Sequence, residues 1–97
     1  MSTNNRRYSM TVDEASQIII KPYITEKTFN LIEKENKLTF IVAEKASKNQ
    51  IAEAMRILYE SEADDINTTR TIKGKKAHIK LIATGGAREL ATKLGLV

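Results

Sequence analysis

The 97-residue chain has no cysteine or tryptophan, one proline, one histidine and few aromatic side chains. The lack of cysteine excludes disulfides and thiolate metal sites and is compatible with a reducing, intracellular compartment. No apolar run approaches the roughly 20 residues that a membrane span needs, and the polar start lacks the apolar stretch of a secretory signal. These absences predict a soluble, cytoplasmic protein with one small domain.

The residues that could carry catalysis are sparse. Two lysines share the predicted strand face of His78, which disfavours the imidazolium, and no nearby carboxylate orients the ring. A solvated or RNA-contacting histidine is therefore favoured over a general base. Asp64 and Asp65 are adjacent, so on a strand they would point to opposite faces and would not share a metal. Gly85 and Gly86 lack the spacing of a phosphate loop. We expect no enzyme, no metal site and no cofactor.

Charge, by contrast, is abundant and sorted along the chain. Sixteen Lys and Arg against twelve Asp and Glu give a net charge of +4 at pH 7. The segment 60–65 is acidic, whereas every charged residue between Ile66 and Ile82 is basic. A small protein that sorts its charges in this way presents one surface to polyanions, and nucleic acid is the expected partner.

Hydrophobic patterning in the first half predicts a strand, a helix and a second strand. The β-branched run at 18–20 suits a buried strand. Thr25 should cap a helix that ends near Asn36 and turns Phe29 toward the core. Residues 38–43 are apolar on both strand faces, which predicts a central strand.

The second half predicts a helix, a β-hairpin and a final helix. Residues 47–50 match a capping box, and the helix that follows carries one apolar stripe. Residues 66–72 and 76–83 alternate polar and apolar side chains around a turn at 73–75. Residues 87–94 form a short amphipathic helix. The predicted fold class is α+β: a β-α-β-α-β-β-α sandwich with a largely antiparallel sheet and helices packed on it.

The first 16 residues are polar and have little apolar periodicity. We expect residues 1–16 to form a flexible N-terminal tail and residues 17–97 to form one RNA-binding domain. Arg6, Arg7 and Tyr8 offer contacts to RNA, but nearby acids offset their charge. A simple solvated tail is an equally supported interpretation.

The predicted hairpin suits the backbone of a folded RNA. Alternate residues on a strand recur about every 7 Å, a spacing comparable to that of successive phosphates. Lysines that guard an exposed edge are the alternative, but the absence of acid between 66 and 82 favours RNA. The hairpin contains no aromatic residue for base stacking, so contacts with phosphates and RNA shape are expected. The residues assigned to this interface are Asn67, Thr68, Arg70, Thr71, Lys73, Gly74, Lys75, Lys76, His78 and Lys80.

Three stretches of the chain carry a family resemblance. They are Lys21-Pro22-Tyr23-Ile24-Thr25-Glu26-Lys27, then Asn36-Lys37-Leu38-Thr39-Phe40-Ile41-Val42, then Ile66-Asn67-Thr68 leading to Lys73-Gly74-Lys75-Lys76-Ala77. In this order and spacing they resemble the universal large-subunit ribosomal protein family number twenty-three, over residues 18–97. The resemblance implies the same α+β fold and binding of large-subunit ribosomal RNA at the rim of the peptide exit tunnel. We therefore add Lys21, Lys27 and Lys37 to the expected RNA contacts.

The resemblance also implies protein partners. These are the neighbouring large-subunit ribosomal protein number twenty-nine and factors that meet nascent chains. In relatives the turn that matches Ile24, Thr25 and Glu26 lies on the exposed docking surface, and Glu26 is the factor-facing acid. As a first-turn charge, Glu26 also complements the helix dipole.

The connection between the last two predicted strands indicates which branch of the family the chain resembles. Bacterial members carry a long basic loop between these strands, whereas here only a few residues join them, and residues 90–96 read Leu-Ala-Thr-Lys-Leu-Gly-Leu. Both features resemble the archaeal branch, for which the signal recognition particle is the expected docking partner. A free-standing RNA-binding regulatory module is the alternative. An acylphosphatase-like hydrolase is disfavoured because residues 21–25 contain no arginine for an anion loop.

Overall fold

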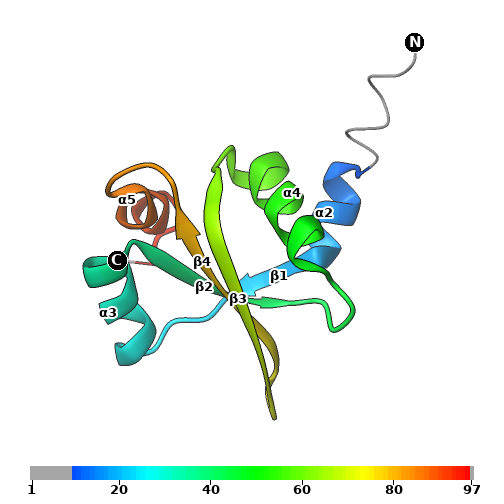
Figure 1. Ribbon diagram of the computed structural model, residues 1–97, viewed down its shortest axis with the longest axis horizontal. Helices are drawn as coiled ribbons and strands as arrows, with labels where there is room; N and C mark the ends of the chain where they lie inside the picture. Colours follow the sequence, from blue (N-terminus) through cyan, green and yellow to red (C-terminus); the bar gives the residue numbers. More distant parts are fainter. Residues whose placement is uncertain (1–9, 97) are drawn as a thin grey trace.

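A computed structural model describes residues 10–96 and arranges eight elements around a single sheet (Figure 1). In chain order they are α2 (Val12–Ile18), β1 (Ile19–Pro22), α3 (Glu26–Glu35), β2 (Lys37–Val42), α4 (Lys48–Tyr59), β3 (Ala63–Thr71), β4 (Gly74–Leu81) and α5 (Gly86–Lys93). The strand order is β1-β2-β4-β3 and every pairing is antiparallel. The predicted α+β class is confirmed, with one helix added before the first strand.

Helices α2 and α4 pack on each other and cover one face of the sheet, while α3 and α5 pack together at the end where β2 begins and β4 stops (Figure 1). The hydrophobic core lies beneath α4, whose Ile51, Ala54 and Met55 have no exposed surface. They cluster with alternate residues of the two central strands, Leu38, Phe40, Val42, Ala77, Ile79 and Leu81. Among residues 10–96 there is no helix with the length and apolar character required to cross a membrane.

Local capping signals fix the starts of α3 and α4 as the sequence predicts. The Ser47 hydroxyl accepts a hydrogen bond from the Gln50 amide at 3.1 Å, and the Gln50 side chain accepts one from the Ser47 amide at 2.9 Å. Thr25 caps α3 by the same reciprocal arrangement with Thr28. These bonds satisfy backbone donors that the first turn of a helix leaves unpaired.

The structure corrects the expected extent of the N-terminal tail, because Val12–Ile18 form helix α2. Thr11 and Glu14 make a capping box, and Ala15 is fully buried where α2 packs on α4. A single buried alanine gives almost no apolar period, so packing on α4 rather than propensity stabilises this short helix. Residues 1–9, with Arg6, Arg7 and Tyr8, lie outside the described residues.

Two further expectations are wrong in detail. Phe29 does not face the core: 37% of its surface is exposed, and Thr28 and Ile32 are the buried positions of α3. Strand β3 begins at Ala63 rather than Ile66, because the acidic residues that follow Ala63 pair with the end of β4 despite their low β propensity.

Asn36 joins the ends of three elements. It ends α3 in the left-handed conformation, with φ at 58°, which asparagine tolerates better than most residues. Its Nδ2 donates to the carbonyls of Leu81 and Ala83 at 2.9 and 2.8 Å, and its Oδ1 accepts from the Ala87 amide at 2.8 Å. One side chain thereby pairs three backbone groups at the end of β4 and the start of α5.

We predict that Asn36→Gly lowers the free energy of unfolding by about 2–4 kcal/mol, because glycine keeps the left-handed backbone but removes all three side-chain bonds. Urea denaturation followed by circular dichroism measures the loss. Glu60→Gly is the matched control, since Glu60 also ends a helix at positive φ (52°) and its side chain is exposed. Equal changes in the two variants would show that the backbone conformation, rather than the bonding of Asn36, governs stability here.

Candidate nucleic-acid interface

The face of the sheet away from α2 and α4, here called the open face, presents alternate residues of all four strands. Cross-strand partners share a face, so the pairs Lys37–Lys80, Thr39–His78 and Ile41–Lys76 form rows across it. Strand β3 extends the rows through Asp65, Asn67 and Thr69, and β1 extends one through Lys21. Seven predicted RNA contacts therefore lie on one surface: Lys21, Lys37, Asn67, Thr71, Lys76, His78 and Lys80.

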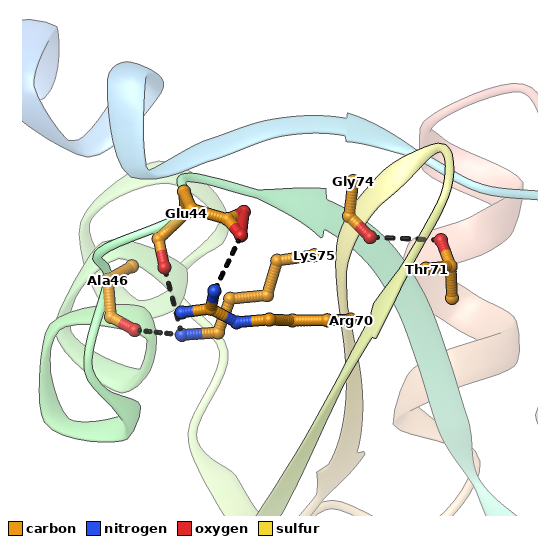
Figure 2. Close-up of polar contacts among 6 residues, drawn as sticks. All are labelled: Glu44, Ala46, Arg70, Thr71, Gly74 and Lys75. Carbon is orange, nitrogen blue, oxygen red and sulfur yellow. Dashed lines mark hydrogen bonds and ion pairs between the residues drawn. The ribbon is translucent and has the colours of Figure 1, made fainter.

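Arg70 and Lys75 are cross-strand partners, and each is one residue along its strand from the open-face pair Thr69–Lys76. Because side chains alternate along a strand, Arg70 and Lys75 lie on the opposite face of the sheet. Both reach the loop between β2 and α4 (Figure 2). The Lys75 Nζ donates to the Ala46 carbonyl at 2.7 Å and to that of Glu44 at 3.4 Å. The Arg70 Nη1 lies 3.0 Å from a carboxylate oxygen of Glu44. The two cations thus hold the hairpin onto the body of the fold.

Thr68 and the residues of the turn complete the predicted hairpin contacts. Thr68 opposes Ala77 on the helix-covered side. Thr71 donates its hydroxyl to the Gly74 carbonyl at 2.9 Å and closes the turn (Figure 2), where Gly74 adopts a φ of +123°. Lys73 is exposed in this turn, and the hairpin tip projects away from the helices in Figure 1.

Tyr23 is the functional candidate that the sequence reasoning missed. Its ring lies under Lys76, with the Nζ 3.9 Å from the ring centroid, and the Lys73 Nζ lies 6.0 Å away. The Tyr23 amide donates to the Thr39 carbonyl at 2.9 Å, and its carbonyl accepts from the Thr28 hydroxyl at 3.0 Å. The alternation of side chains along a strand could have identified it, because Tyr23 is two residues after Lys21 and so lies on the same face.

His78 lies at the centre of the open face. Its Nδ1 is 2.8 Å from the hydroxyl oxygen of Thr39, which is completely buried. Partial burial, followed by the positive charges of Lys37, Lys76 and Lys27, lowers the pKa of the imidazole below its usual value of 6.5. The ring is therefore neutral at neutral pH, as its lysine neighbours suggested, and the positive charge of this face comes from lysines alone.

The lysines of the open face are mostly unpaired. Lys37 contacts the Glu35 carboxylate at 3.1 Å. Within the described part of the chain, five others form no ion pair: Lys21, Lys27, Lys73, Lys76 and Lys80. Lys27 projects from the first turn of α3 at the border of this face, close enough to affect His78. Across residues 10–96 no cluster of three or more His, Asp or Glu side chains could hold a metal.

The predicted docking residues form the corner between β1 and α3. Ile24 is 39% exposed, and Glu26 is exposed in the first turn of α3. The Thr25 hydroxyl is occupied, since it accepts a hydrogen bond from the Thr28 amide at 3.2 Å. All three residues are exposed, and Ile24 and Glu26 are the two whose side chains do not take part in capping α3.

Comparison with known proteins matches residues 17–93 to the family described as Ribosomal protein L23. The "Large ribosomal subunit protein uL23" of Methanobrevibacter smithii is 46% identical over 84 residues, which cover 86% of this chain and 98% of the relative. Proteins with the same description from Methanococcus maripaludis and Methanococcus vannielii are 46% and 45% identical over the same shares of each chain.

We predict that His78 titrates with a midpoint below 6.5, because burial and three lysines disfavour its charged form. The folded protein then binds fewer protons than the unfolded chain between the two pKa values. The contribution of His78 to folding stability is therefore complete above pH 6.5. It is lost as the pH falls from 6.5 toward the lower pKa of the folded protein. NMR titration of the ring resonances measures the midpoint without ambiguity, since the chain has one histidine. A midpoint at or above 6.5 would contradict this placement of the ring.

Proposed function

The chain belongs to the ribosomal protein L23 family, and we propose that it binds large-subunit ribosomal RNA through the open face of its sheet. The resemblance predicted from its sequence, including the archaeal type, is confirmed. The protein is a structural constituent of the large ribosomal subunit in the cytoplasm, and it is not an enzyme.

The observation that carries the RNA proposal is the array of unpaired lysines on the open face. With a rise of about 3.3 Å per residue and about 5 Å between neighbouring strands, Lys80 lies about 13 Å and Lys21 about 10 Å from Lys76 on the same face. Salt largely screens exposed charges from one another at these separations, so it is the shared orientation of several unpaired lysines toward one face that favours a polyanion. Asn67 and Thr69 add groups that hydrogen-bond to phosphate or 2′-hydroxyl oxygens.

The two faces of the sheet give the cations of the hairpin two different roles, RNA contact and attachment of the hairpin. Lys76 and Lys80 face the proposed RNA, with Lys21, Lys27 and Lys37 beside them and Lys73 at the tip. Arg70 and Lys75 are already bonded to the loop at Glu44 and Ala46, so we assign them to holding the hairpin in place. Direct RNA contact from these two would first require those bonds to break.

We further propose that the protein lies at the rim of the polypeptide exit tunnel beside ribosomal protein number twenty-nine. The family resemblance supports both placements. The corner formed by Ile24, Thr25 and Glu26 would receive the signal recognition particle or another nascent-chain factor, with Ile24 and Glu26 making the side-chain contacts. This corner borders the open face, so a factor can reach Glu26 while the lysines of the sheet contact RNA.

Substituting Lys76 and Lys80 together by Gln should weaken binding to large-subunit ribosomal RNA at least about tenfold at 0.15 M salt. The slope of log affinity against log salt should fall in magnitude by about 1.5 to 2, because two phosphate contacts are lost. Filter binding across a salt series measures both quantities.

The matched control is Lys34→Gln with Lys93→Gln, which removes the same charge from exposed positions on α3 and α5. Lys75→Gln is a second control, expected to lower stability by about 1–2 kcal/mol through its lost carbonyl bonds while leaving the salt slope unchanged. Equal slope changes for the two double variants, with about half that change for Lys75→Gln, would mean that net charge rather than the open face drives binding.

Tagged protein should co-sediment with the large subunit on a sucrose gradient and remain there after a high-salt wash. Many simultaneous contacts with folded RNA resist screening better than a single electrostatic encounter does. Recovery only at the top of the gradient would favour the free-standing RNA-binding module instead.

A further inference from the structure

A groove on the open face combines an apolar floor with a cationic rim. It lies between α3 and the β3–β4 hairpin, and its volume is about 290 Å³. Its lining includes Lys27 and Leu31 from α3 and Thr69, Lys76 and His78 from the hairpin. This volume is at the lower end of the roughly 300–1,000 Å³ typical of small-molecule pockets, so it suits one nucleotide rather than a stack of bases.

The lining of this groove contains no Asp or Glu. Four other hollows of the described surface each contain at least one carboxylate, contributed for example by Glu60, Glu35, Glu14 and Asp65. A hollow with lysines and no acid favours an anionic ligand, and the other four do not.

The cationic rim is partly pre-organised. The Lys76 ammonium rests 3.9 Å from the centre of the Tyr23 ring, and Tyr23 is itself fixed by backbone bonds to Thr39 and Thr28. A lysine held in this way loses less side-chain entropy when it binds a phosphate than a freely rotating one does. Since Lys76 already covers this face of the ring, a base entering the groove contacts Leu31 and does not stack on that face.

The hairpin side of the groove provides hydrogen bonding suited to a base edge. His78 bonds to Thr39 through Nδ1, and its Nε2 makes no hydrogen bond among residues 10–96. A neutral imidazole nitrogen acts as either donor or acceptor according to its tautomer, which suits the edge of a base better than a phosphate. The Thr69 hydroxyl likewise has no partner within that range, and it can donate or accept.

We propose that this groove holds a single unpaired nucleotide of the bound RNA. Its phosphate lies at the rim formed by Lys27 and Lys76, and its base lies against Leu31 with its edge toward His78 and Thr69. The inference rests on the proposed RNA-binding function and adds a ligand that recognition of RNA shape alone does not require. It also restores a role for base contact that the lack of aromatics in the hairpin strands argues against.

The test is an NMR titration of the full chain with uridine 5′-monophosphate, adenosine 5′-monophosphate and inorganic phosphate. At least one mononucleotide should bind with a Kd about tenfold or more below that of phosphate, because its base adds contacts that phosphate lacks. It should shift the Leu31 methyl and His78 ring resonances. Equal affinities, or shifts confined to residues near the lysines, would reduce the groove to a simple anion site and overturn the proposal.

Thr69→Phe fills the groove and leaves every charge in place, so it should abolish the advantage of the mononucleotide over phosphate. Asn30→Phe is the control, because Asn30 is exposed on α3 beside Leu31 but does not line the groove and is not an assigned RNA contact. Leu31→Gln removes the apolar floor from the other side and serves if Thr69→Phe disturbs folding. A nucleotide preference that persists in both groove variants would overturn the proposal.

Binding to large-subunit ribosomal RNA, measured in parallel, separates this inference from the function on which it rests. If the protein binds the RNA but does not prefer a mononucleotide to phosphate, the nucleotide-binding role of the groove is overturned and the RNA-binding proposal stands. Protein that shows the preference but does not bind the RNA supports the groove and contradicts the ribosomal-RNA proposal.

Discussion

The bonding of one side chain, that of Asn36, joins the ends of three elements of the fold. It lets the chain reverse from α3 into β2 while pairing the backbone at the end of β4 and the start of α5. Because β2 and β4 are the central strands, this joint fixes their register where Lys37 meets Lys80. Every row of the open face follows from that register.

Register matters here because the side-chain period of a strand is two residues. Lys75 and Lys76 are neighbours in sequence, yet one anchors the hairpin at Ala46 and the other lies over Tyr23 on the open face. A slip of one residue would exchange these tasks, exposing the anchor and burying the proposed RNA contact. The hairpin therefore uses one face for attachment and the other for recognition.

The sequence predicts those features whose causes are local. The capping boxes at Thr25 and Ser47, the buried alternation of β4 and the end of α3 at Asn36 each depend on residues within a few positions. Helix α2 escaped prediction although Thr11 and Glu14 form a capping box, because the helix has almost no apolar period and is stabilised by packing on α4. The bond of Lys75 to Ala46 and the approach of Tyr23 to Lys76 escaped for the same reason, since both join segments far apart in the chain.

The sorting of charge explains why these long-range contacts matter for function. The positive charge of the open face comes from lysines, most of them unpaired within the described residues, because burial and the neighbouring lysines lower the pKa of His78 and keep its ring neutral. Acids approach this face at its Lys37–Lys80 end, where Glu35 pairs with Lys37. Asp65 lies opposite Lys80 at the same end, whereas among residues 10–96 no acid lines the groove between α3 and the hairpin. The fold thus orients its unpaired cations toward one surface before any ligand arrives, and this fixed orientation favours a polyanion there.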